Sequence, residues 1–216
     1  MALSTYALVS LDEAKGHLLV PGGAQDDYLE RAINRASELI EQYLDRHIVT
    51  RGDLTEYHTL RSPTGAFLCK DTIRTLQRPI ISVSSVHEDT AWPRTYGASS
   101  LLVVDVDYQV DKQRGTIRRL GSAGPVAWHT GHRGVRLIST CGYEDTAKVP
   151  ERIKAVALRL VANIKGEVDR KTHGILAQSD SLGNFTRFGP ATLTDDMKDD
   201  LAGELRTEVF GTGEAA

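Results

Sequence analysis

The chain has 216 residues, a formal net charge of −3 and 40% apolar residues, which is typical of a globular protein with a core of its own. This charge excludes a generally basic nucleic-acid-binding protein, although a local basic patch remains compatible with it. The two cysteines, Cys69 and Cys141, lie far apart and outside any CxxC pattern. The sequence therefore indicates two free thiols rather than a disulfide scaffold or a thiolate metal site.

The first 50 residues predict two helices. Ser10-Leu11-Asp12-Glu13 has the form of a capping box, which predicts a short helix from Leu11 to Leu19. Pro21-Gly22-Gly23 ends this helix, and a longer one is expected over Asp27–Arg46. The apolar residues of the second helix fall on one side: Leu29, Ala32, Ile33, Ala36, Ile40, Tyr43 and Leu44. Both helices need an apolar partner surface.

Residues 51–148 form a β-rich insertion, because the apolar period changes there from 3.6 to 2. The clearest pattern is Leu102, Val104, Val106, Tyr108 and Val110 alternating with more polar neighbours, which predicts a strand with one buried and one exposed face. A turn at residues 112–115 leads into a further strand over Thr116–Leu120. Other strands are expected at residues 79–86 and 135–141, and weaker ones at 53–60 and 66–69.

Residues 149–168 predict the central helix of the bundle. Pro150 suits its first turn, where a missing N–H costs nothing, and Glu151 suits the positive end of the helix dipole. The apolar residues share one broad arc: Ile153, Val156, Ala157, Leu160, Val161, Ile164 and Val168. Leu158 lies off this arc with Arg152 and Arg159 nearby, so we expect these three residues to meet a neighbouring subunit.

Residues 169–216 predict an extended C-terminal arm. The stretch to Leu193 has no convincing period yet contains several apolar residues, which favours docking over disorder. A short helix follows, capped by Thr194, with an apolar residue at every fourth position. This stripe is a candidate partner-binding face. The residues expected to lose apolar exposure on docking are Leu182, Phe185, Phe188, Met197, Leu201 and Leu205.

The sequence offers little support for catalysis. The GxSxG, GxxxxGK[ST], GxGxxG and HExxH signatures are absent, so no catalytic residue and no cofactor is predicted. His129 and His132 could hold zinc, but no third ligand stands at a diagnostic spacing, and a solvated loop is the preferred interpretation. Arg114, Arg118 and Arg119 cluster without interleaved aromatic residues, which favours a solvated face. No run of about 18 apolar residues predicts a membrane span.

The order of these segments resembles head–tail connector (adaptor) proteins of long-tailed bacteriophages and related prophage or gene-transfer particles. The similarity rests on the helices SLDEAKGHL and DDYLERAINRASELIEQYLDR, and on the strand segments RPIISVSSV, YQVDKQRGTI and RLISTCGYEDTAKVP. It continues through the helix ERIKAVALRLVANI to the late segment SDSLGNFTRFG. It extends from about Ser10 to Val209.

This resemblance implies a ring, usually dodecameric, placed between the portal protein and the stopper or tail, where it extends the DNA channel. It implies a structural protein, with residues 182–210 engaging the portal. Double-stranded DNA would pass through without sequence-specific binding, and net acidity is compatible with such passage because phosphate neutralisation creates non-specific affinity. The protein would act in the virion neck after assembly in the host cytoplasm.

We therefore predict an α+β protein with a small helical bundle, a β-rich insertion and an extended C-terminal arm, acting as a head-to-tail adaptor. A stopper or tail-completion protein is the nearest alternative. A small metal-dependent hydrolase using His129 and His132 is a more distant one, and a host nucleic-acid module is the weakest.

Overall fold

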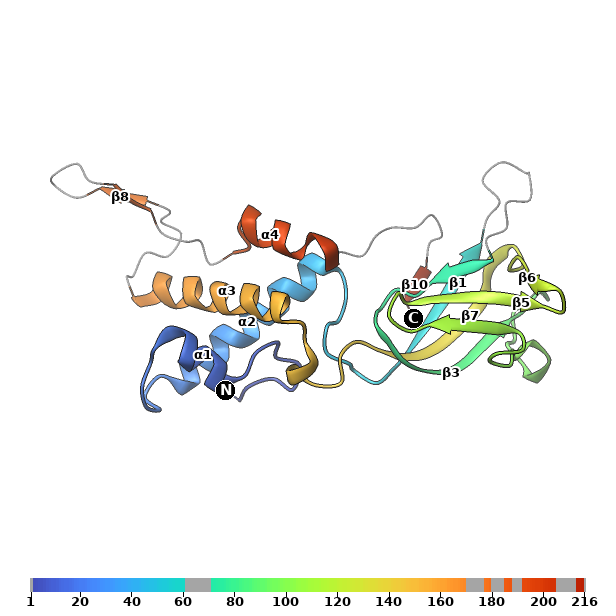
Figure 1. Cartoon of the computed structure of the whole chain (residues 1–216), viewed down its shortest axis with the longest axis horizontal. Coiled ribbons are helices and arrows are strands. Elements are labelled where there is room, and N and C mark those ends of the chain that lie inside the picture. Colours follow the sequence, from blue (N-terminus) through green and yellow to red (C-terminus); the bar gives the residue numbers. More distant parts are fainter. Residues whose placement is uncertain are drawn as a thin grey trace. The chain divides into compact units, whose positions relative to one another are not determined.

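The computed structural model describes residues 2–60, 71–169, 177–179, 185–187, 192–204 and 213–215, the three-residue segments by their backbone alone. The chain forms two compact units, which we call the helical unit (residues 1–49 and 145–205) and the β unit (residues 50–144 and 206–216). In Figure 1 the helical unit is blue at its N-terminal segment and orange to red-orange over residues 151–169 and 195–204, and the β unit runs from cyan to yellow with residues 213–215 in red. The β unit is thus inserted between two helical segments of the sequence.

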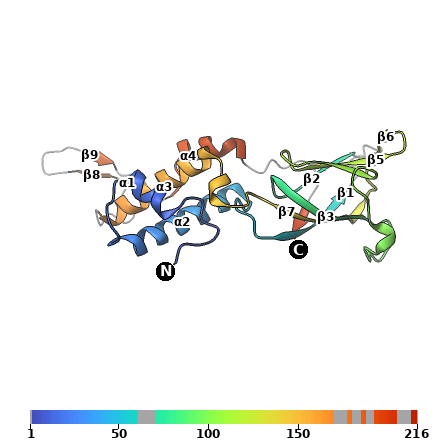
Figure 2. The ribbon, with the colours of Figure 1, turned by 60° about the horizontal axis from the view of Figure 1, so that its bottom comes forward.

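The described α-helices of the helical unit are α1 (Leu11–Leu18), α2 (Asp26–Leu44), α3 (Glu151–Asp169) and α4 (Asp195–Leu201). The predicted capping box is present at α1, because Ser10 Oγ accepts the Glu13 N–H at 3.2 Å and Glu13 Oε2 accepts the Ser10 N–H at 2.7 Å. Helix α3 contacts each of the other three helices (Figure 2). The predicted bundle helices are therefore confirmed.

The core of the helical unit lies between these helices. The arc predicted for α3 is buried from Ile153 to Ile164, whereas Val168 at its end is 38% exposed. Its partners are the apolar side of α2 and residues that follow it, namely Leu29, Ala32, Ile33, Ala36, Ile40, Leu44 and Ile48. Two amphipathic helices that are far apart in sequence thus bury each other's apolar faces.

The β unit contains two antiparallel sheets. One has the order β10-β1-β7-β3 and the other β2-β5-β4, with β6 paired to β5. The strands of the first sheet are β1 (Asp53–Leu60), β3 (Ile80–Glu88), β7 (Gly131–Cys141) and β10 (Gly213–Ala215). Those of the second are β2 (Thr72–Arg74), β4 (Tyr108–Asp111), β5 (Thr116–Gly121) and β6 (Gly124–Pro125). Mixed helices and antiparallel sheets confirm the predicted α+β class.

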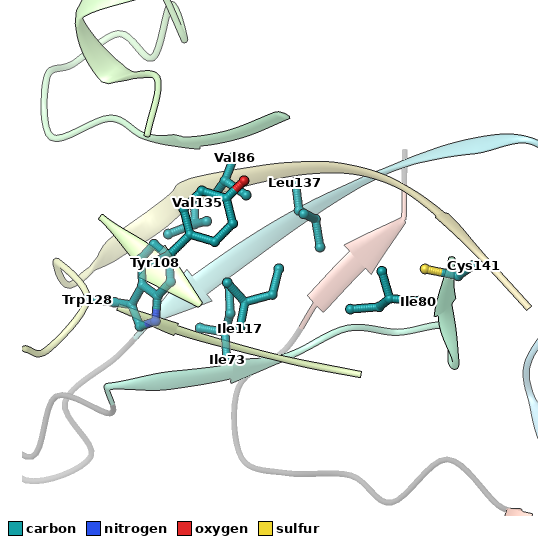
Figure 3. Close-up of a cluster of buried hydrophobic side chains, with 9 residues drawn as sticks. All are labelled: Ile73, Ile80, Val86, Tyr108, Ile117, Trp128, Val135, Leu137 and Cys141. Carbon is teal, nitrogen blue, oxygen red and sulfur yellow. The ribbon is translucent and has the colours of Figure 1, made fainter. Parts of the chain in front are cut away.

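Side chains from both sheets form the core of the β unit (Figure 3). Trp128, Ile117 and Leu137 are almost fully buried in it. Cys141 lies in the same cluster, and burial raises the pKa of its thiol to about 11, so this cysteine is an unreactive part of the core. Cys69 lies outside the described residues.

The strand predicted from Leu102 to Val110 is wrong over most of its length, because β4 begins only at Tyr108. The Asp107 carboxylate accepts the Val103 N–H at 2.8 Å, and Asp105 adopts a left-handed φ of 62°. An aspartate tolerates this conformation and bonds to nearby backbone, so the segment folds as a turn instead of a strand.

Five short strands among the described residues escaped the sequence analysis, namely β2, β6, β10, β8 (Ala177–Ser179) and β9 (Phe185–Arg187). β2 has only three residues, and β8 pairs with β9 in the segment expected to be irregular. Strands this short carry too few alternations to give a periodic signal. The weak strand predicted at residues 66–69 lies outside the described residues.

Candidate functional site

Helix α4 carries two residues that were predicted to dock on a partner. Met197 is 2% exposed and Leu201 is 0% exposed, because α4 packs against α3 within the helical unit. A side chain that is already buried has no apolar exposure to lose. The expectation of exposure is therefore wrong for these two residues in the isolated chain, whereas portal binding by the arm stays a prediction.

Charged groups add to the contact between α4 and the bundle. Arg159 Nη1 lies 2.7 Å from Asp200 Oδ2, with both side chains about half exposed. Arg46, which is almost fully buried, pairs with Glu204 just beyond α4. Arg152 Nη2 donates a long bond of 3.4 Å to the Asp199 carbonyl. Arg152 and Arg159, predicted to meet a neighbouring subunit, thus already have contacts within their own chain.

The other predicted interface residues are only partly described. Leu158 is half-buried on α3, so part of its side chain remains available to a neighbour. Phe185 lies in β9, where only the backbone is described. Leu182, Phe188 and Leu205 lie outside the described residues. Their roles at the portal and between subunits stay predictions.

The largest run of exposed apolar side chains lies in the β unit, in the turn that replaces the expected strand. Leu101 is 48% exposed, Val103 54%, Val104 51% and Val106 66%. We call these four residues the apolar loop. Exposed aliphatic residues that form a cluster mark an interaction surface more often than single exposed residues scattered over the surface do. The alternating aspartates at positions 105 and 107 were the signal for a turn here.

A second surface of the β unit combines arginine and tyrosine. Tyr57 of β1 and His87 of β3 both pair with Arg136 of β7, so the three lie in one row on one face of the sheet. The Arg136 guanidinium lies 4.8 Å from the ring centroid of Tyr96, and the Arg133 guanidinium lies 3.8 Å from that of Tyr57. The tyrosine centroids are 5.6 Å apart. We call Tyr57, Tyr96, Arg133 and Arg136 the Arg–Tyr cluster.

The loop that carries Tyr96 is held by one carboxylate. Asp89 accepts the N–H groups of Ala91, Thr95 and Tyr96 at 2.9, 2.9 and 3.0 Å. These hydrogen bonds hold the pKa of Asp89 below its ordinary value of 3.8. Arg94 in the same loop donates to the carbonyls of Asp89 and Ala91. The position of Tyr96 over the sheet is therefore built into the local hydrogen bonding.

A buried acid–histidine pair faces the interior of the β unit. Glu56 Oε2 and His58 Nε2 lie 3.3 Å apart on β1, and both side chains are buried. Both Glu56 oxygens accept the Leu76 N–H, at 3.1 and 3.0 Å. Glu56 thus satisfies a backbone N–H within the core, whereas His58 Nε2 is buried without a hydrogen-bond partner among the described residues.

The two histidines considered for zinc have no further ligand group with them among the described residues. His129 and His132 are exposed, and His132 Nδ1 lies 3.3 Å from Thr59 Oγ1. Within the described residues, no group of three or more His, Cys, Asp or Glu side chains could hold a metal ion. None of the described helices is long and apolar enough to cross a membrane.

The described residues thus form an α+β scaffold on which the apolar loop is exposed to solvent. Residues 8–81 match the family described as phage gp6-like head–tail connector proteins. This segment, which contains α1, α2 and β1, is therefore similar to the head–tail connector family, and the predicted resemblance is confirmed for it. The family is one of structural connectors rather than enzymes. Among curated proteins, no sequence matches the chain.

Two solved structures share the fold over almost the whole chain. One is a chain from the neck of an empty gene transfer agent particle, with a TM-score of 0.54, 18% identity and coverage of 97% of this chain and 95% of that chain. The other comes from the virion of a native gene transfer agent particle, with a TM-score of 0.53, 16% identity and the same coverage. These similarities establish the fold.

Proposed function

We propose that this protein is a structural head-to-tail adaptor of a virion neck. In this proposal, copies of the chain form a ring between the portal protein and the stopper or tail, and the ring extends the channel through which double-stranded DNA passes. The observation that carries the proposal is the connector-family match over residues 8–81. The fold shared with a chain from a particle neck supports it.

A closed ring needs two different surfaces on each subunit, because each copy contacts the next head to tail. The apolar loop is suited to one such contact, since its four residues are exposed in the isolated chain. The partly exposed Leu158, with Arg152 and Arg159 beside it, is suited to the other. Dodecameric symmetry is the ring size that the family resemblance implies.

Portal binding is assigned to the remaining apolar residues of the C-terminal arm. Met197 and Leu201 are already covered by α3, so Leu182, Phe185, Phe188 and Leu205 are the better candidates. Deleting residues 181–216 would also remove α4 and expose the α3 surface beneath it. The sharper variant is therefore Leu182→Ser with Phe188→Ser, compared with Thr186→Ser in the same segment.

Electron microscopy of the purified protein mixed with its portal protein tests the proposal. Ring density at the narrow end of the portal is expected, and the Leu182→Ser/Phe188→Ser variant should lose it while Thr186→Ser keeps it. Binding to tail or stopper proteins but never to the portal would contradict the adaptor assignment and favour another neck component, such as a stopper or tail-completion protein. In this proposal the protein assembles in the host cytoplasm and then stays in the virion. Its absence from purified particles would contradict a place in the virion.

A further inference from the structure

The Arg–Tyr cluster has positive charge that the described chain leaves unneutralised. No carboxylate or other hydrogen-bond acceptor contacts the guanidinium of Arg133 or Arg136 in the part of the chain that the structure describes. Arg136 Nε is buried without a hydrogen-bond partner there. The nearby Asp89 accepts three backbone N–H groups instead. An N–H group that is buried without an acceptor is unfavourable.

The backbone beneath the cluster is held in an unusual conformation. Tyr96 has a φ of 49° and Arg133 a φ of 48°, both in the left-handed region that side-chain-bearing residues rarely adopt. The Tyr96 hydroxyl donates to the Arg133 carbonyl at 2.5 Å, and the Arg133 N–H donates to Thr59 Oγ1 at 3.0 Å. Non-glycine residues in this region are strained and concentrate at ligand-binding sites. Two of them meet in this one cluster.

The other left-handed non-glycine residues have local explanations. Leu19 and Asp45 end helices α1 and α2 as C-caps, and Asp105 turns the apolar loop. Tyr96 ends no helix, and Arg133 lies where the register of β1 and β7 shifts between His58 and Leu60, as at a β-bulge. Their conformation instead brings two guanidinium groups and two phenol rings together on one side of the sheet.

We propose that the Arg–Tyr cluster binds the phosphate backbone of double-stranded DNA. This inference deepens the adaptor function proposed above. It rests on that function only for the place of the DNA contact within the particle. Arginine and tyrosine, with neighbouring Thr and Ser hydroxyls, are the side chains that contact phosphate. Thr55 and Ser85 lie on the same face, two residues along β1 and β3 from Tyr57 and His87.

A polar face distinguishes this surface from a protein–protein contact. The centre of a protein interface is usually apolar, with few charged residues. The exposed aliphatic side chains of the β unit gather instead in the apolar loop and at Val126. Burial, with the charge of Arg136 adding to it, lowers the pKa of His87, so this histidine is neutral at pH 7 and the arginines supply the charge.

The expected binding is weak and depends on salt. A net charge of −3 opposes association of the whole chain with DNA, and two arginines neutralise only about two phosphates. Such a contact can guide DNA without holding it. Binding of the full chain to a short labelled DNA duplex is therefore measured by fluorescence anisotropy over a series of low salt concentrations.

The test variant is Arg133→Gln with Arg136→Gln, and the matched control is Arg114→Gln with Arg118→Gln. Both change the net charge equally, and the control arginines are exposed in the same unit, at 82% and 54% of their side-chain area. The test variant is expected to lose most of the binding, with a salt slope smaller by about 1 per arginine. The control should bind like the natural chain.

A second pair, Arg133→Lys with Arg136→Lys, separates charge from packing. Lysine keeps the positive charge but loses planar stacking on tyrosine, so this variant should retain the salt slope even where its melting temperature falls. Loss of binding equal to that of the glutamine variant would overturn the proposal in favour of a structural role.

Two other results would also overturn it. One is undetectable duplex binding by the natural chain at the lowest salt concentration, and the other is tighter binding to polyglutamate than to DNA of equal charge, which would assign the cluster to an acidic protein. Ring formation on the portal is scored separately for every variant. A variant that forms rings but has lost DNA binding leaves the adaptor function standing, whereas DNA binding without rings leaves this inference standing.

Discussion

Replacing Leu201 with alanine tests whether α4 belongs to the folded helical unit or is a free docking helix. Leu201 is fully buried, and its neighbour Met197 on the same helix is 2% exposed. Truncating a buried leucine to alanine costs about 2–5 kcal/mol, the sum of lost apolar burial and the cavity left behind. A seven-residue helix at the edge of a bundle can relax into such a cavity, so we expect about 2–3 kcal/mol.

The loss of unfolding free energy is measured by urea unfolding, with the helical circular dichroism signal as the readout. Both tryptophans, Trp92 and Trp128, lie in the β unit, so tryptophan fluorescence follows that unit while circular dichroism follows the helices. The midpoint of the helical transition should fall with little change in its slope. The matched control is Lys198→Ala on the same helix, whose side chain is 41% exposed and pairs with a 95% exposed Asp195. It should change the stability by less than about 0.5 kcal/mol.

A loss below about 0.5 kcal/mol for Leu201→Ala would refute the packing of α4 on α3 in the isolated chain. It would restore the alternative in which Leu201 stays exposed until a partner covers it. A loss of the expected size instead means that any portal contact made by Leu201 requires α4 to leave the bundle first.

Three further predictions concern other contacts. Lys154 is 8% exposed and lies 3.0 Å from Glu13 Oε1, and Lys154→Met should cost about 1 kcal/mol in urea unfolding at neutral pH, because the partly exposed Glu13 keeps its water. Burial raises the pKa of Glu13, but its hydrogen bonds outweigh burial and hold it below 4.5, so the cost should shrink as the pH falls below that value. Asp89→Asn should lower the melting temperature at neutral pH, and this difference should shrink as the pH falls from 3.8 through the lowered pKa of the natural carboxylate, where that group becomes protonated. An unchanged difference across this range would contradict the hydrogen bonding described. Val104→Ser with Val106→Ser should alter stability by no more than about 0.5 kcal/mol yet weaken ring formation in electron micrographs, and normal rings would remove the apolar loop from the subunit interface.

Local rules were sufficient for the helices and for the longer strands. The capping box at Ser10 depends on residues within one turn, so its sequence signature and its hydrogen bonds coincide. The 3.6-residue patterns of α2 and α3 are long enough to identify their buried sides. β1 has the bounds that were predicted, Asp53–Leu60.

The apolar period predicted the wrong structure where a strand depends on a neighbouring strand to pair with. The alternation from Leu102 to Val110 describes a strand only if a neighbouring strand pairs with it along its whole length. Such pairing is confined to Tyr108–Asp111, and the preceding Asp107 carboxylate accepts the Val103 backbone N–H instead. The valines there are exposed because the turn places them at the surface.

The sequence by itself determined which stretches are amphipathic, where the helices begin, and the connector resemblance. The three-dimensional arrangement decided what each apolar stripe faces: Met197 and Leu201 on α4 face α3 in the same chain. It also assembled the Arg–Tyr cluster, whose members lie at positions 57, 96, 133 and 136. Contacts between residues so far apart arise only when β1, β7 and the intervening loop come together, because strand register and turn geometry are set by the whole β unit.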